Sequence, residues 1–196
     1  MFADNPLILA SASPRRADLL AFAGVHFEIA PSDIAECRRP DETPAAYVSR
    51  LAKEKAIARP HPGRPVLAAD TIVFIGNDIF EKPEGPEEAA RHLSALAGRS
   101  HWVATAFCLI GPDGLARAHD VVVSAVTFRQ LTAREIEAYV AAGESLDKAG
   151  AYGLQGTGAF LVDSINGSLT SVIGLPLPEV LQALRAVENE TRSPRL

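Results

Sequence analysis

The sequence predicts one compact domain built from both strands and helices. An apolar run at residues 7–10 leads directly into a capped helix, and two long β-rich runs follow at residues 102–110 and 118–128. The chain of 196 residues is long enough for one sizeable core or for two lobes around a cleft. With 47% hydrophobic and 22% charged residues, the composition is that of a globular protein and excludes the disordered and fibrous classes.

The first half of the chain is expected to form, in order, a strand at 7–10, a helix at 14–23, a strand at 27–30, a polar loop at 33–42 and a helix at 44–58. Ser13 is a good N-cap, Pro14 suits the first helical position, and Gly24 ends the first of these helices. Lys55 falls on the mostly apolar side of the second helix.

The second half is expected to begin with a strand at 66–69 that ends at Asp70 and Thr71, after which residues 72–75 continue extended. The remaining expected elements are a helix at 86–96, a hairpin turn at 111–114 between the two β-rich runs, a capping-box helix from Thr132 to 142, an Asn166-Gly167 hairpin turn, a helix at 178–187 and a frayed tail at 189–196.

Charge and apolar patterning exclude several classes of protein. A net charge of −5 argues against a protein that coats nucleic acid. No apolar run reaches the roughly 18 residues that span a bilayer, and no signal-like segment opens the chain. Cys37 and Cys108 are too isolated for a disulfide framework. We therefore expect a cytoplasmic protein with reduced thiols that binds neither nucleic acid nor a membrane.

Arg15 and Arg16 stand in the first turn of a helix, where the partial positive charge of the helix terminus disfavours cations. A bound phosphate makes this arrangement favourable, because its negative charge attracts both the helix terminus and the arginines. The backbone N–H groups, the hydroxyls of Ser11 and Ser13, and the guanidinium groups can all donate hydrogen bonds to it. The alternative is a pair of solvated arginines on an exposed helix start.

Further charged residues are expected at the ends of strands and helices: Glu36, Lys55, Asp70, Glu81, Lys82, Asp147 and Lys148. Together with the arginines they supply the groups that phosphoanhydride hydrolysis needs, since cations hold the phosphates, carboxylates bind Mg²⁺ or a similar ion, and one carboxylate activates water. The chain has no P-loop, dinucleotide, nucleophile-elbow or HExxH motif, and its five histidines lack metal-ligand spacing.

Six short segments stand out in order along the chain: SASPRR at 11–16, RLAKEKA at 50–56, ADT at 69–71, EKP at 81–83, DKAGAYGLQG at 147–156 and VIGLP at 172–176. In this order they resemble the motifs of the Maf family of nucleoside triphosphate pyrophosphatases. The resemblance covers nearly the whole chain. It implies an α/β fold similar to that of inosine triphosphate pyrophosphatases, with a mixed, strongly bent sheet, flanking helices and two lobes around a nucleotide cleft in a single domain over 1–196. It also implies frequent homodimers and a divalent metal, Mg²⁺ or Mn²⁺.

Within the family, the chain resembles the branch that cleaves dTTP and UTP to the monophosphate and pyrophosphate. Its SPRR, ADT and LQG segments match that branch, whereas the 7-methyl-GTP branch typically has SPWR, SDQ and SEG. We therefore assign substrate selection to Arg15, Thr71 and Gln155. The amide of Gln155 both donates and accepts, which suits a uracil or thymine edge with two acceptors around one donor.

The mechanistic hypothesis makes Asp70 the proton acceptor for water that attacks a phosphorus at the α–β bridge, with Glu36 and Asp70 as metal ligands. Lys55, Lys82, Lys148 and Arg16 are assigned to the phosphates. Asp147 is equally well explained as a structural partner of Lys148.

Two other functions remain open at the level of sequence: a pyrophosphatase for non-canonical purine triphosphates, and a nucleotide-binding regulator of cell division and septum formation with little catalysis. The sequence also leaves open whether modified pyrimidine triphosphates are the true substrates, and whether Arg15 contacts base or phosphate.

Overall fold

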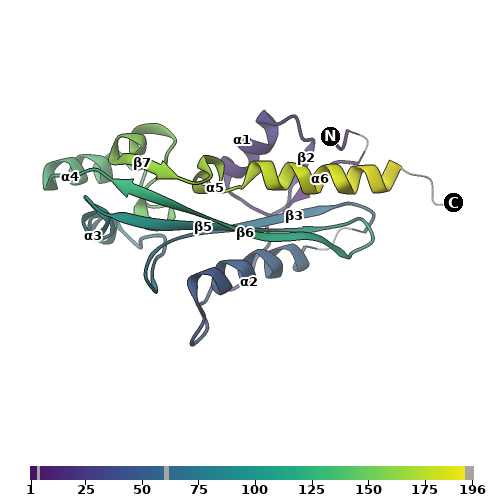
Figure 1. Ribbon diagram of the computed structural model, residues 1–196, viewed down its shortest axis with the longest axis horizontal. Helices are drawn as coiled ribbons and strands as arrows, with labels where there is room; N and C mark the ends of the chain where they lie inside the picture. The colour runs from purple at the N-terminus through teal and green to yellow at the C-terminus, as the bar shows by residue number, and fades with distance from the viewer. Residues whose placement is uncertain (4, 60–61, 193–196) are drawn as a thin grey trace.

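The computed structural model describes residues 1–3, 5–59 and 62–192. These residues form a seven-stranded mixed sheet with helices on both faces (Figure 1). The strand order is β2-β1-β3-β5-β6-β7, and the short β4 pairs with β3 off this path. Strand β1 runs parallel to β2 and β3, and the other pairs are antiparallel. The strands are β1 (Leu7–Leu9), β2 (Phe27–Ile29), β3 (Val66–Ile75), β4 (Asp78–Phe80), β5 (Ser100–Ile110), β6 (Ala116–Phe128) and β7 (Val162–Asn166).

Helices α1, α5 and α6 lie on one side of the sheet and α2 on the other, while α3 and α4 gather at the end of the long strands away from the chain termini (Figure 1). The helices are α1 (Pro14–Phe22), α2 (Pro44–Ile57), α3 (Pro86–Leu96), α4 (Ala133–Ala141), α5 (Leu169–Ile173) and α6 (Leu177–Arg192), with the 3₁₀ segments η1 (Ala149–Ala151) and η2 (Gly156–Leu161). This arrangement confirms the predicted α/β class with a mixed sheet and flanking helices. The strong bend and the two lobes stay predictions.

Strand β3 separates two hydrophobic clusters. Leu67 and Ala69 belong to the cluster that includes residues of α1 and α6, whereas Ala68 and Ile72 belong to the cluster under α2. Because successive side chains of a strand point to opposite faces, Asp70 lies on the α2 face and Thr71 on the α1 face. A third cluster joins α3, α4 and the far ends of β5 and β6.

The sequence placed a strand end at Asp70 and Thr71 with residues 72–75 extended beyond it, and the structure joins the two parts in one strand, β3, that runs through Asp70 to Ile75. What changes near Asp70 is the neighbouring strand. Strand β1 pairs with β3 up to Leu67, and β4 pairs from Val73 onwards. Between these two registers, this edge of β3 has no partner strand in the described part of the chain, so side chains on both faces are accessible from one opening.

The local turn and cap predictions have mixed outcomes. The turn at 111–114 joins β5 and β6 as predicted, and Thr132 and Glu135 form the predicted capping box. The Asn166-Gly167 hairpin is wrong, because the Ser168 side chain accepts a hydrogen bond from the Ser171 N–H and starts helix α5 instead.

Helix α6 runs to Arg192, beyond the predicted end at 187, so residues 189–192 of the predicted frayed tail are helical, and 193–196 lie outside the described residues. Within the described residues, both cysteines are free, and no helix has the length and apolar character needed to cross a membrane.

Candidate active site

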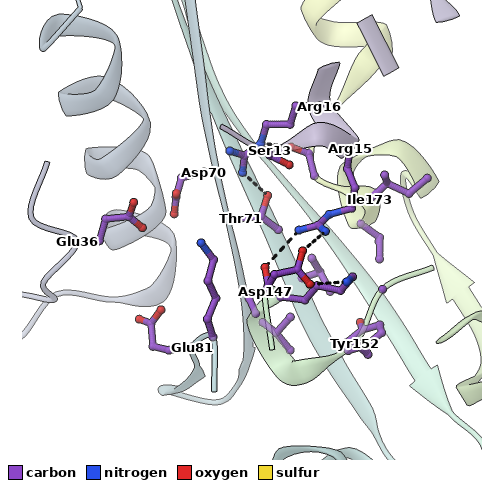
Figure 2. A pocket seen from close by; sticks show the side chains of 18 of the residues that line it. Ser13, Arg15, Arg16, Glu36, Asp70, Thr71, Glu81, Asp147, Tyr152 and Ile173 are labelled. Atoms are coloured by element: carbon purple, nitrogen blue, oxygen red, sulfur yellow. Dashed lines mark hydrogen bonds and ion pairs between the residues drawn. The ribbon is translucent and has the colours of Figure 1, made fainter. Parts of the chain in front are cut away.

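A cavity of about 380 Å³ opens at the unpaired edge of β3 (Figure 2). Side chains from α1, α2, β3, the loop before α2 and the segment around η1 line it. The cavity brings together nine of the residues predicted from sequence: Ser13, Arg15, Arg16, Glu36, Lys55, Asp70, Thr71, Lys82 and Lys148. Segments from opposite ends of the chain thus meet in one polar cavity.

Asp70 and Lys55 form a buried ion pair on the α2 face of β3. The side chains are each about 9% exposed, and the Lys55 ammonium contacts Asp70 Oδ1. The same ammonium lies 2.8 Å from Oε1 of Glu36, a half-exposed residue of the loop before α2. Burial raises the pKa of Asp70, while the charges of Lys55 and Arg16 oppose that rise. Asp70 is therefore a desolvated carboxyl group held between cations.

Glu81 lies at the rim of the same cavity, just after β4 (Figure 2). Partial desolvation raises the pKa of its carboxyl group, and the charges of Asp70 and Glu36 add to the rise. The sequence placed Glu81 among the charged residues but gave it no role, because its proximity to Asp70 depends on the β3–β4 hairpin. Lys82, the next residue, is exposed.

Arg16 is buried at the start of α1, where it binds three groups of the protein. Its Nε donates to the Gly174 carbonyl oxygen at 2.8 Å, one terminal nitrogen donates to Ser11 Oγ at 2.8 Å, and the other to Thr71 Oγ1 at 3.2 Å. Burial lowers the pKa of this guanidinium. Arg16 therefore ties α1 to β3 and to the end of α5 as well as facing the cavity.

Ser13 occupies the N-cap position of α1 as predicted, but its side chain makes no capping hydrogen bond, and the first turn contains no acidic residue. The N–H groups of this turn are thus not satisfied by a side-chain cap, the condition under which a helix start attracts an anion. Ser11 is buried beneath it and accepts from Arg16, but it does not line the cavity.

Thr71 is the acceptor of one hydrogen bond and the donor of another. Thr105 Oγ1 donates to the Ser171 carbonyl oxygen at 2.7 Å, which uses its only hydroxyl hydrogen. In the 2.9 Å contact between the two threonines, Thr71 is therefore the donor, while it accepts from Arg16. The chain of bonds runs from Arg16 through Thr71 and Thr105 to Ser171 in the middle of α5.

Asp147 pairs with both Arg15 and Lys148 across the cavity (Figure 2). Its Oδ2 lies 2.9 Å from Arg15, and its Oδ1 lies 2.5 Å from Lys148 Nζ. The interpretation of Asp147 as a partner of Lys148 thus agrees with the geometry, and Arg15 is a second partner that the sequence did not indicate.

Gln155 is exposed, precedes η2, and lies outside the residues that line the cavity. Its role in substrate selection stays a prediction. Besides Glu81, the lining residues that received no role from sequence include Arg38, Tyr47 and Tyr152. Arg38 falls in the predicted polar loop at 33–42. Tyr47 was indicated only by the amphipathicity of its helix, whereas Tyr152 falls within the DKAGAYGLQG segment but was given no role of its own.

The donor set fits a hard divalent cation that arrives with a phosphate ligand. Asp70 and Glu36 offer carboxylate oxygens, and Mg²⁺ is usually held by one or two carboxylates together with substrate phosphates. The described residues contain no group of three or more His, Cys, Asp and Glu side chains placed to hold an ion by themselves. The Lys55 ammonium forms ion pairs with both carboxylates, Glu36 and Asp70. A metal cation that binds between them therefore has to displace the ammonium or share the two carboxylates with it.

The family model described as "Maf-like protein" matches residues 6–187. A dTTP/UTP pyrophosphatase of Syntrophus aciditrophicus is 49% identical over 189 residues, covering 95% of this chain and 92% of the relative. A dTTP/UTP pyrophosphatase of Escherichia coli O6:K15:H31 is also 49% identical, over 91% of each chain, and a nucleoside triphosphate pyrophosphatase of Shigella flexneri is 48% identical over the same shares.

Among solved structures, a HAM1 protein from Coxiella burnetii superposes with a TM-score of 0.50 at 16% identity. The match covers 95% of this chain and 99% of that one, and it concerns the fold alone.

Proposed function

The chain belongs to the Maf family, and we propose that it hydrolyses dTTP and UTP to the monophosphate and pyrophosphate. One observation carries this proposal: a buried carboxyl group, Asp70, shares a polar cavity with cations on both faces of β3. Lys55 approaches from the α2 face, and Arg16 from the α1 face. The names of the similar pyrophosphatases and the ordered motifs support the same reading.

Asp70 is proposed as the proton acceptor. Lys55 contacts Oδ1, and among the described residues no hydrogen-bond donor is recorded on Oδ2, which leaves that oxygen for a water molecule. As the water oxygen bonds to a phosphorus at the α–β bridge, the bridging P–O bond breaks, the proton passes to Asp70, and pyrophosphate leaves. The raised pKa of Asp70 makes it a better proton acceptor than an exposed carboxylate.

Cations are proposed to hold the phosphates in two groups. Arg15 and Arg16 stand at the start of α1, whose N–H groups have no side-chain cap, and Lys55, Lys82 and Lys148 line the rest of the cavity. Fixed positive charge of this kind stabilises the negative charge that develops on the leaving pyrophosphate. Glu36 and Asp70 would hold Mg²⁺ or Mn²⁺, which supplies further charge neutralisation on the phosphate oxygens.

The test is pyrophosphate release from a panel of nucleotides, with and without EDTA. We expect turnover of UTP and dTTP well ahead of GTP, ITP and XTP, and its loss in EDTA with recovery on added Mg²⁺ or Mn²⁺. Preferred hydrolysis of ITP or XTP would instead identify a purine house-cleaning enzyme. Tight nucleotide binding without pyrophosphate release would identify a binding protein.

A further inference from the structure

The loop that carries Gln155 closes on itself. At Gly158, an added Cβ would lie 2.1 Å from the Gly153 carbonyl oxygen, so the two ends of the 153–158 segment touch. Gly156 has φ +81°, a conformation that side chains other than glycine rarely adopt. Gln155 therefore stands at the exposed tip of a compact loop, and its position depends on what holds that loop.

Glu144 holds the far end of this loop. Its carboxylate accepts from the Thr157 N–H, at 3.1 Å to Oε2 and 3.3 Å to Oε1, where η2 begins. Hydrogen bonds from the Thr157 side chain and backbone lower the pKa of Glu144, so the carboxylate stays ionised. The approach is close, because a Cβ at Gly156 would lie 2.8 Å from Oε2. Glu144 thus fixes the two residues that follow Gln155.

Lys148 holds the near end. Its side chain packs so tightly on Gly153 that an added Cβ there would lie 2.8 Å from Cδ and Cε. Its Nζ donates to the Glu144 carbonyl oxygen at 2.6 Å. Gln155 is therefore bracketed by two contacts, one before it and one after it, and both come from the segment 144–148.

The same segment also holds Arg15, since the Asp147 carboxylate pairs with Arg15 on one side and with Lys148 on the other. Arg15 and Gln155 are 140 positions apart in sequence, and the described part of the chain shows no hydrogen bond or ion pair between them. Segment 144–148 is the element that contacts both Arg15 and the loop of Gln155.

We propose that Glu144 is a positioning residue for substrate selection: by capping η2 it fixes Gln155 relative to Arg15 so that both meet the acceptor–donor–acceptor edge of a uracil or thymine base. This inference rests on the proposed pyrimidine triphosphate pyrophosphatase function. Glu144 does not line the cavity, so its effect on selection passes through Gln155.

The test uses three single variants, Glu144→Ala, Glu144→Gln and Gln155→Ala. They are compared with the double variant that combines Glu144→Ala and Gln155→Ala. The matched control is Glu137→Ala, which removes an exposed glutamate from the neighbouring helix α4. The measurement is kcat and KM for UTP and GTP, together with hydrogen exchange of the peptide that spans 153–161.

In Glu144→Ala we expect the kcat/KM preference for UTP over GTP to fall about tenfold, mainly through KM, because a displaced hydrogen-bonding partner loses its discrimination. Adding Gln155→Ala should change that ratio by less than about twofold, since the two residues act as one unit. Glu144→Gln keeps an acceptor oxygen and should recover most of the preference. Exchange over 153–161 should rise in Glu144→Ala and stay unchanged in Glu137→Ala.

An unchanged ratio or unchanged exchange in Glu144→Ala, with an active parent enzyme, overturns this inference and leaves the proposed function standing. Fully additive effects of the two substitutions, or an equal loss of kcat on both nucleotides, also overturn it, because either shows that Glu144 acts by another route. A parent enzyme that releases no pyrophosphate overturns the proposed function and the inference together.

Discussion

Arg16 donates a 2.8 Å hydrogen bond from Nε to the carbonyl oxygen of Gly174, a residue 158 positions later in the chain. Gly174 ends helix α5 and has φ +131°. The bond joins the start of α1 to the end of α5 at the wall of the cavity. Arg16 and its neighbour Arg15 therefore differ in kind, since Arg16 is buried among protein partners, while Arg15 forms an exposed ion pair with Asp147.

Substitution should separate these two arginines. Arg16→Ala leaves the Gly174 carbonyl, the Ser11 hydroxyl and the Thr71 hydroxyl without their donor, which should lower the free energy of unfolding by about 2–4 kcal/mol and abolish turnover. Arg15→Ala removes an exposed pair and should change that free energy by at most about 1 kcal/mol. Denaturant unfolding of both variants checks this. Equal destabilisation would contradict the structural role of Arg16.

The second prediction concerns Asp70. Asp70→Asn keeps the shape of the side chain but removes the proton acceptor, so pyrophosphate release should fall about 10²–10⁴-fold while the fold is retained. Asp78→Asn, an exposed change on the neighbouring strand β4, serves as the control and should leave turnover within about twofold. Near-normal turnover in a folded Asp70→Asn enzyme would show that another group accepts the proton.

Structural features that depend on neighbouring residues in the sequence could be predicted better than those that depend on contacts between distant segments. The Thr132 capping box was predicted because its partner, Glu135, is three residues away and the motif is local. The Asn166-Gly167 hairpin failed because Ser168, also local, competes by capping a helix. The predicted strand end at Asp70 is wrong, although residues 72–75 are extended as predicted, because a carboxylate inside an apolar run resembles a strand end, whereas the pairing with β5 continues through Asp70.

The site residues show the same limit. Arg15 and Arg16 were singled out because cations at the start of a helix are electrostatically unfavourable, and this position alone predicted a bound anion. Their different roles depend on Gly174 and Asp147, which only the fold brings near. Glu81 received no role for the same reason, because the desolvation and the neighbouring charges that raise its pKa arise in three dimensions.

The third prediction is a pH dependence of stability that originates at His101. This side chain is 1% exposed, its Nε2 lies 2.7 Å from the Tyr152 hydroxyl, and its Nδ1 has no hydrogen-bond partner within the described residues. Burial lowers the pKa of His101 to about 4. The folded protein therefore keeps a neutral imidazole at pH values where the unfolded chain, with a pKa near 6.5, binds a proton.

Because the unfolded state binds the extra proton, stability must fall as pH decreases from about 6.5 to about 4, by up to about 1.4 kcal/mol per pH unit. His101→Gln does not titrate, so the free energy of unfolding measured at pH 7, 6 and 5 should fall less steeply than in the parent. His26→Gln, at an exposed position, should keep the parent slope. An identical slope in His101→Gln would mean that the imidazole binds its proton over the same pH range in the folded and the unfolded protein.

The last prediction tests the hydrogen-bond chain behind Thr71. Thr105 is fully buried, donates to the Ser171 carbonyl oxygen and accepts from Thr71. Strands β5 and β6 also provide a matched exposed pair, Ser100 and Thr127, whose hydroxyl oxygens lie 2.8 Å apart. A hydroxyl lost inside the protein leaves its partners unsatisfied, whereas water replaces one lost at the surface.

Thr105→Val should therefore lower the free energy of unfolding by about 1–3 kcal/mol, while Thr127→Val should change it by less than about 0.5 kcal/mol. Thr105→Ser keeps the hydroxyl and should lose only the packing of one methyl group, about 1 kcal/mol. In Thr105→Val the Thr71 hydroxyl loses the group to which it donates, so the hydroxyl that accepts from Arg16 is no longer fixed in orientation. Turnover should therefore fall in Thr105→Val but not in Thr127→Val. Equal losses in the two valine variants would show that the buried chain adds nothing beyond an ordinary cross-strand pair.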